Sequence, residues 1–246
     1  MKIGFYGHSS ASLHGDPRSL VDQVEKHFSA QIVNIGKPQC SEERTYHELK
    51  KTRGIPDIAL VFHGHPNHSF IPSCDRDLSL KKVPTTKVKY LWNEREEHWG
   101  ESAGTPTFEE FERDFLHPGS SIKQVFVDQD TFVNSMSIYK EYFWTPELYQ
   151  NRWECAMLGI DEFCSTQIPF VIHVRRKSWM PPWYPTLKSG ITNEKLDELV
   201  WQNKPFHPPY NPDDLNTIVL RNNLSVFQNN EMAKEIIKLI TENYKE

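Results

Sequence analysis

The sequence predicts an α/β protein built on a doubly wound parallel sheet, and the first sixty residues provide the main observations. Short apolar strands are expected at 2–6, 31–35 and 58–62, with a helical pattern between each pair. The third strand is apolar throughout, which is typical of a strand buried on both faces of a parallel sheet. Strand and helix therefore alternate, which predicts right-handed βαβ crossovers and a layered architecture.

Both intervening helices carry start signals. Asp16 followed by Pro17 predicts an N-cap and a proline at the first helical position, with the helix running to about residue 28. Ser41, followed by two glutamates, predicts the start of the second helix, because acidic side chains stabilise a helix N-terminus. Gly54 marks the point at which that helix has ended.

The regular alternation breaks down from about residue 70 to residue 167. We interpret this stretch as a long helical and aromatic insertion in a single domain that spans residues 1–246. A capping box predicts a helix at 107–115, and a strand or an edge extension is expected at 123–127. A further helix is expected from about Pro146.

Regular order returns toward the C-terminus. A fourth buried strand is expected at 169–174, and a last helix at 230–244 carries an apolar stripe that should lie on the sheet. Between them, Trp179, Trp183 and Tyr184 alternate with prolines. These aromatic residues could line a groove for a glycan or a peptide, or they could pack against the sheet.

Composition and charge narrow the functional classes. The chain has 28 basic and 33 acidic residues, with a net charge of -5, and the basic residues are scattered, so no nucleic-acid partner is expected. No apolar run approaches the roughly 20 residues of a membrane helix, and no signal peptide is visible, so we expect a cytoplasmic protein with no membrane partner. The four cysteines lack the spacing of a zinc module or a disulfide framework.

A serine stands directly after the first strand, in the segment Gly7-His8-Ser9. Such a turn lies at the carboxyl end of a strand, where open α/β sheets place their ligand crevice. The helix that follows can also stabilise a developing negative charge with its N-terminus. Ser9 is therefore a candidate nucleophile, and the alternative is a Gly/Ser turn without chemistry.

Three loops taken together resemble the first three blocks of the SGNH (GDSL-like) hydrolases. They are Gly7-His8-Ser9, the segment 34–39 after the second strand, and the segment 64–67 after the third. The resemblance implies a flavodoxin-like five-stranded parallel sheet and a serine that attacks an ester or thioester. We expect no cofactor. Carried over to this sequence, it implies Ser9 as the nucleophile, with Gly36 and Asn67 as oxyanion donors.

The last block of that family carries Asp-x-x-His, and this sequence departs from it. Leu220 and Asn223 occupy the matching positions, which removes the general base and its orienting carboxylate. His8 also replaces the aspartate of the first block, and Gln39 replaces a glycine that is common in the second. A serine without a base is a poor nucleophile.

Two interpretations follow from this departure. In the first, another histidine supplies the base, and His207, with Asp213 or Asp214 after it, is the nearest substitute in sequence. The reaction would then hydrolyse an O-acyl ester of a small molecule or a carbohydrate. In the second, the crevice binds its ligand without turning it over. In both, His8, His63 and His65 would line the crevice.

A third interpretation comes from His63, His65 and His68, which resemble the His-x-His-x-Asp-His ligand set of metallo-β-lactamase-like hydrolases. Alternate residues leave a strand end on the same side, so His63 and His65 could share a zinc ion. Asn67 stands in place of the aspartate, and no downstream ligand pattern is clear. The strand–helix alternation also differs from that fold, so the sequence favours the serine over the metal.

Overall fold

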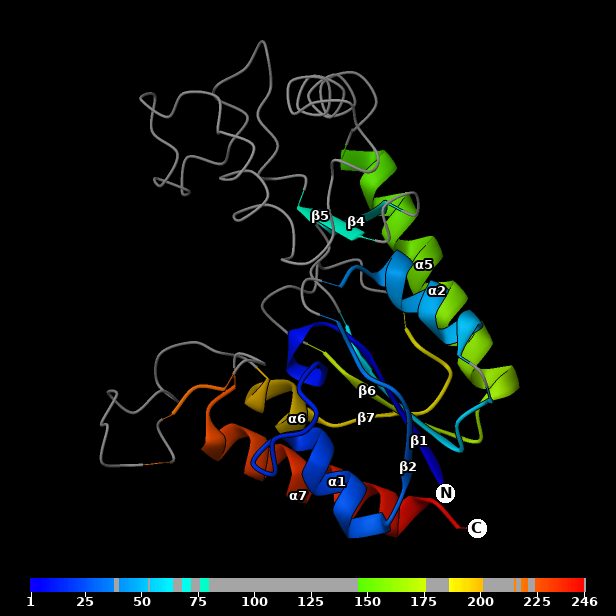
Figure 1. Ribbon diagram of the computed structural model, residues 1–246. Coiled ribbons are helices and arrows are strands. Elements are labelled where there is room, and N and C mark those ends of the chain that lie inside the picture. The colour runs from blue at the N-terminus through cyan, green and yellow to red at the C-terminus, as the bar shows by residue number, and fades with distance from the viewer. Residues whose placement is uncertain are drawn as a thin grey trace, which may run out of the picture.

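A computed structural model describes most of the N-terminal third of the chain and most of its C-terminal third. The described residues are 1–37, 40–52, 54–63, 68–71, 76–79, 146–175, 186–200, 215, 218–220 and 224–245. Their main element is a five-stranded parallel sheet with the strand order β2-β1-β3-β6-β7 (Figure 1). Its strands are β1 (Lys2–Gly7), β2 (Gln31–Asn34), β3 (Ile58–Phe62), β6 (Phe170–Val174) and β7 (Ile191–Thr192).

This strand order confirms the predicted doubly wound α/β fold and is compatible with a flavodoxin-like sheet. From β1 the chain moves to one side to form β2, and it then returns past β1 to form β3. The direction of winding therefore reverses between β1 and β3, and ligands of open α/β sheets bind outside the carboxyl ends of the strands at such a point. The residues that end these strands, Gly7 and Phe62, are paired with one another.

Helices cover both faces of the sheet (Figure 1). One face packs against α1 (Leu20–Phe28), α6 (Glu194–Leu199) and α7 (Val226–Asn243), and the core there includes Phe5, Leu60 and Ile172. The other face packs against α2 (Glu42–Lys51) and α5 (Pro146–Gln167). Each large apolar side chain removed from water in these layers contributes about 1.5–3 kcal/mol.

Helix α5 confirms the helix predicted from Pro146, and its residues Trp153, Met157 and Ile160 are buried as expected. Around the predicted start of the insertion, β4 (His68–Ile71) and β5 (Arg76–Ser79) form a separate antiparallel pair. The helix predicted at 107–115, the strand predicted at 123–127 and the aromatic residues Trp179, Trp183 and Tyr184 lie outside the described residues.

The start of α1 corrects the sequence prediction. The carboxylate of Asp16 accepts hydrogen bonds from the backbone N–H and the guanidinium of Arg18, and these bonds lower the pKa of Asp16 to about 2. Asp16 therefore closes a local turn, and the N-cap is Ser19, whose hydroxyl accepts from the Asp22 N–H. Helix α7 also begins earlier than predicted, because Ser225 and Gln228 form a capping box.

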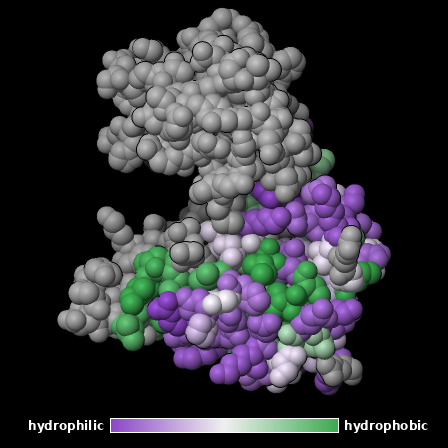
Figure 2. Space-filling model, viewed as in Figure 1, coloured by the Kyte–Doolittle hydropathy of each residue, from purple (hydrophilic) through white to green (hydrophobic). Residues whose placement is uncertain are grey.

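The described surface carries few large apolar side chains. On the face shown in Figure 2, hydrophilic residues dominate the coloured surface, with hydrophobic patches near α6 and the start of α7. The exposed large apolar residues of the described chain are Ile55, Leu158, Leu215, Val219 and Phe227. None of the described helices combines the length and the apolar character needed to cross a membrane.

Gly7→Ala should destabilise the fold much more than Gly15→Ala. Both glycines have positive φ, +100° and +87°, so alanine is strained at either position. A Cβ at Gly7 would also lie 1.8 Å from the carbonyl oxygen of Phe62, whereas a Cβ at Gly15 would meet nothing within 4 Å. We expect losses of about 3 kcal/mol or more for Gly7→Ala and about 1 kcal/mol for Gly15→Ala. Urea unfolding measures both, and equal losses would contradict the proposed close contact.

Candidate functional site

The candidate site lies where β1 and β3 end side by side at the carboxyl edge of the sheet. The backbone N–H of His8 donates to the carbonyl of Phe62 at 3.3 Å, one residue beyond the last registered pair. The positive φ of Gly7 turns the chain away from the sheet at this point. The turn that follows β1 is therefore fixed directly against the end of β3.

Ser9 begins a short 3-10 helix, η1 (Ser9–Ala11), in this turn. It is half-buried, whereas its neighbours His8 and Ser10 are 5% and 2% exposed. The Ser9 carbonyl accepts hydrogen bonds from the N–H and the hydroxyl of Ser12, which fix the backbone of the turn. Ser9 thus combines a rigid backbone with a side chain that is more accessible than those on either side.

The ring of His8 is oriented by the same turn. Its Nδ1 accepts a hydrogen bond from the Ser10 N–H at 3.2 Å. This contact holds the imidazole against η1, with its Nδ1 as an acceptor. The predicted role of His8 in substrate binding stays a prediction.

The predicted oxyanion role of Gly36 is not supported by the hydrogen bonds. The Gly36 N–H donates to the Ala11 carbonyl at 3.0 Å, and the Lys37 N–H donates to the Gly7 carbonyl at 2.8 Å. A backbone amide has one hydrogen, so the amide of Gly36 is used to hold the turn against the loop after β2. In this structure these contacts fix the shape of the site and leave Gly36 no amide for a bound ligand.

A chain of five buried polar side chains starts beside this turn and crosses the sheet beneath α2 and α5. His63 Nδ1 lies 3.3 Å from both carboxylate oxygens of Glu42, and its Nε2 lies 3.0 Å from Nδ1 of His173. His173 Nε2 lies 3.1 Å from the hydroxyl of Ser189, which donates to Asp161 at 2.6 Å. None of the five residues is more than 6% exposed.

Burial and hydrogen bonding set the charges at one end of this chain. Burial, and then the charge of His63, lower the pKa of His173 to about 3, so its ring is neutral at ordinary pH. Burial alone would raise the pKa of Asp161. The Ser189 hydroxyl and the backbone N–H groups of Lys188 and Ser189 donate to this carboxylate and bring its pKa below the ordinary value.

An ion pair between a half-buried arginine and a buried aspartate lies next to this chain. Asp197 of α6 is fully buried and accepts from the backbone N–H of Arg175 at 2.7 Å and from its guanidinium at 2.8 and 3.0 Å. Burial raises the pKa of Asp197, and the hydrogen bonds from Arg175 oppose that rise. The pair fastens α6 to the end of β6 and supplies the buried carboxylate of Asp197 with its partners.

These contacts also correct the predictions for His63. Both of its ring nitrogens are engaged inside the protein, and the side chain is fully buried, so it neither lines an open crevice nor offers a lone pair to a metal ion. The predicted three-histidine metal set therefore loses its first ligand. His65, Asn67 and His207 lie outside the described residues, and His68 is described only through its backbone in β4.

The last predicted block is described in part. Leu220 is buried, and its backbone N–H donates to the Leu224 carbonyl just ahead of α7. The position at which the family carries its aspartate is thus occupied here by an apolar core residue. Asn223, Asp213 and Asp214 lie outside the described residues.

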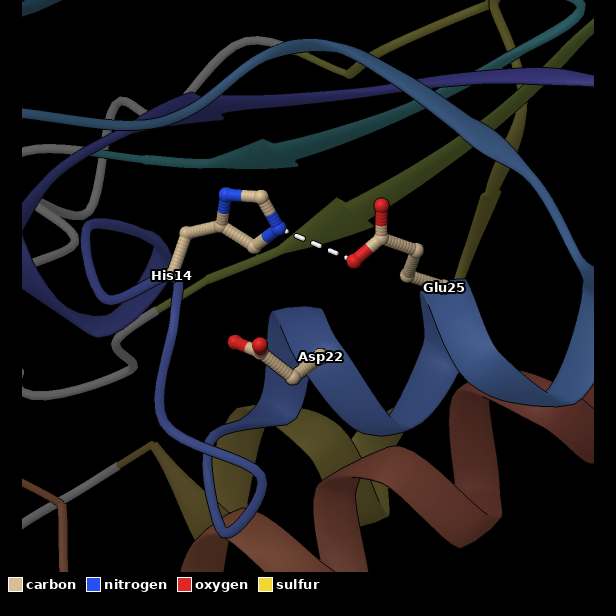
Figure 3. A group of neighbouring side chains, drawn as sticks. All are labelled: His14, Asp22 and Glu25. Atoms are coloured by element: carbon tan, nitrogen blue, oxygen red, sulfur yellow. Dashed lines mark hydrogen bonds and ion pairs between the residues drawn. The ribbon is translucent and has the colours of Figure 1, made fainter.

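A cluster of possible metal ligands lies at and ahead of α1 (Figure 3). It consists of one ligand atom each from His14, Asp22 and Glu25, and these atoms lie within 4.8 Å of one another. In that view His14 and Glu25 point toward each other, and their side chains form an ion pair of 2.9 Å. Both oxygens of Asp22 accept from the Gly15 N–H, and one also accepts from the Ser19 hydroxyl. These contacts close the loop ahead of α1, and we assign the group that structural role.

The sequence patterns do not predict four members of the buried chain. They indicate only a helix N-terminus at Glu42 and a buried strand at His173. A histidine flanked by Ile172 and Val174 was the available signal, because a strand buried on both faces needs a polar partner for an imidazole. Asp161 and Ser189 have no comparable local signal, since only the fold brings them together.

No protein-family model matches this sequence, and no curated protein matches it.

Acidification should destabilise the protein through His173. An unfolded histidine takes up a proton near pH 6.5, whereas the pKa of His173 in the folded protein is about 3. Its contribution to stability is therefore present above pH 6.5 and is lost as the pH falls toward 3. Between about pH 6.5 and pH 5 we expect a loss of about 1–2 kcal/mol, measured by urea unfolding. His173→Gln should show a shallower pH dependence over this interval, and an identical slope would contradict the assignment.

Proposed function

We propose that this protein is an SGNH-like serine esterase that hydrolyses O-acyl esters at the carboxyl edge of its sheet, with Ser9 as the nucleophile. The observation that carries the proposal is the position of Ser9. It is the half-buried residue of a rigid turn at the point where the winding of the sheet reverses. That position suits a ligand crevice, and the resemblance of the loop sequences to SGNH hydrolases supplies the chemistry.

The reaction proposed is an acyl transfer in two steps. The Ser9 hydroxyl attacks the carbonyl carbon of the ester, its proton passes to a base, and the alcohol leaves with a proton to give an acyl-serine. Water then attacks the acyl-serine, which releases the carboxylic acid and restores the hydroxyl. The resemblance to the family suggests Asn67 as an oxyanion donor. The order of residues suggests His207 as the base, since it is the nearest substitute in sequence. The substrate proposed is an ester of a small molecule or a carbohydrate.

The second candidate is a ligand-binding protein without catalysis, in which the same edge of the sheet holds a small molecule or a glycan. A specific observation favours it. The amide of Gly36 and both ring nitrogens of His63 are used inside the protein, so two groups that could have served catalysis serve the fold. A cytoplasmic location stays a prediction for both candidates.

Fluorophosphonate labelling followed by peptide mass spectrometry tests the serine directly, because the probe reacts only with an activated hydroxyl. We expect one adduct, on Ser9, and we expect Ser9→Ala to lose the adduct and at least about a thousandfold of the activity toward short acyl esters. Ser165→Ala, at an exposed serine of α5 far from this turn, is the control and should keep the label. A parent protein that is not labelled while it still binds an ester or a glycan would support the second candidate, and a label on another serine would overturn the role of Ser9.

A further inference from the structure

We propose that Glu42, His63, His173, Ser189 and Asp161 form a buried proton-sharing chain that stores one extra proton as an imidazolium at His63. The four contacts between these residues are 3.3, 3.0, 3.1 and 2.6 Å long. The chain does not include Ser9, so this inference is independent of the proposed esterase activity.

The number of contacts fixes the number of protons. Four hydrogen bonds in a row need four protons, one for each contact. Two neutral imidazoles supply two protons, the hydroxyl of Ser189 supplies a third, and two ionised carboxylates supply none. The chain therefore holds one proton more than its neutral histidines and serine carry. Without it, two lone pairs would face one another at one contact inside the protein, which is a costly arrangement.

The direction of the bonds shows where the extra proton resides. The carboxylate of Asp161 already accepts from the backbone N–H groups of Lys188 and Ser189, so it also accepts the hydroxyl proton of Ser189. The Ser189 oxygen then accepts from Nε2 of His173, which leaves Nδ1 of His173 as an acceptor. His63 must donate to that nitrogen from Nε2. The fourth proton is therefore shared between His63 Nδ1 and Glu42.

Two features favour an imidazolium and a carboxylate over a neutral pair. Nδ1 of His63 lies at the same distance, 3.3 Å, from both oxygens of Glu42, as expected for an N–H that faces an ionised carboxylate. Glu42 is also the first residue of α2, directly after its N-cap Ser41, where the helix dipole stabilises negative charge. A proton on Glu42 would forgo that stabilisation.

The surrounding charges are compatible with a cation at His63. The charged and titratable groups that contact His63 or its neighbours in the chain include Glu42 from α2, His173 from β6, Asp161 from α5, and the pair formed by Arg175 and Asp197 of α6. The positive charge of Arg175 is balanced by Asp197, which is fully buried. Glu42 is thus the direct counter-ion of His63, and Asp161 adds a second negative charge at the far end of the chain.

Because the folded protein stores this proton, its free energy of unfolding should fall as the solution becomes alkaline. The folded chain keeps a proton that an unfolded histidine releases near pH 6.5, so the folding equilibrium should weaken as the pH rises above that value. One proton corresponds to a tenfold change in the equilibrium constant for each pH unit. This is opposite in sign to the effect of His173, which acts below pH 6.5.

Nitrogen-15 NMR of the histidine rings in the full chain tests the inference directly. At about pH 8, above the titration of an unfolded histidine, we expect both ring nitrogens of His63 to carry protons. His173 should carry a proton on Nε2 alone. A His63 ring with a single N–H beside an ionised Glu42 would overturn the proposal, and this result requires no variant.

A matched pair of variants tests the role of the counter-ion. Glu42→Gln keeps the shape of the side chain and removes its charge, so His63 should carry a single N–H at about pH 8 and the alkaline loss of stability should disappear. Glu43→Gln is the control, because Glu43 lies in the same first turn but pairs with Arg152 on α5 instead. Glu43→Gln should keep both protons on the His63 ring and the tenfold change in the folding equilibrium constant for each pH unit. A Glu42→Gln protein that keeps both protons, or a Glu43→Gln protein that loses one, would contradict the assignment.

Discussion

The parallel pairing of β1 with β3 is the contact on which the candidate site depends. Five registered pairs run from Ile3 and Ile58 to Gly7 and Phe62, and the carbonyl of Phe62 then accepts the N–H of His8. On one side of this point the chain enters the half-buried turn of Ser9. On the other side, the residue after Phe62 is His63, which belongs to the buried polar chain. The hydrogen bond from His8 to Phe62 therefore joins the half-buried turn of Ser9 to the buried polar chain that contains His63.

The polar chain lies within a layer that is otherwise apolar, so each of its polar groups needs a hydrogen-bond partner inside the chain. Val61, Ile160 and Val171 pack in the same layer between the sheet and the helices α2 and α5. A polar group left unsatisfied there costs about 1–3 kcal/mol, and more when it is charged. The network is stable only as a complete set, so it specifies one arrangement of five segments of the chain. We therefore see it as a constraint on the fold as well as a store of charge.

Local patterns in the sequence predicted the fold well where a single segment decides the outcome. The apolar run of β3 and the inward face of α5 at Trp153 and Met157 are properties of their own segments. The predicted start of α1 was wrong because the Asp16 carboxylate accepts hydrogen bonds from Arg18, two residues away, and does not cap the helix. The buried chain could not be predicted, because His63 and His173 are 110 residues apart and meet only when β3 and β6 pair.

Two carboxylates also determine how mechanical load would pass through the far side of the sheet. The chain leaves β6 at Arg175, which is fastened to Asp197, and it enters β7 after Lys188 and Ser189, which are fastened to Asp161. The pairing of β6 with β7 itself has only two registered residue pairs. A pull on the connecting segment is thus resisted by side-chain clamps at both of its ends before it reaches this short edge strand. The shortest strand pairing of the sheet is therefore reinforced by hydrogen bonds to α5 and α6.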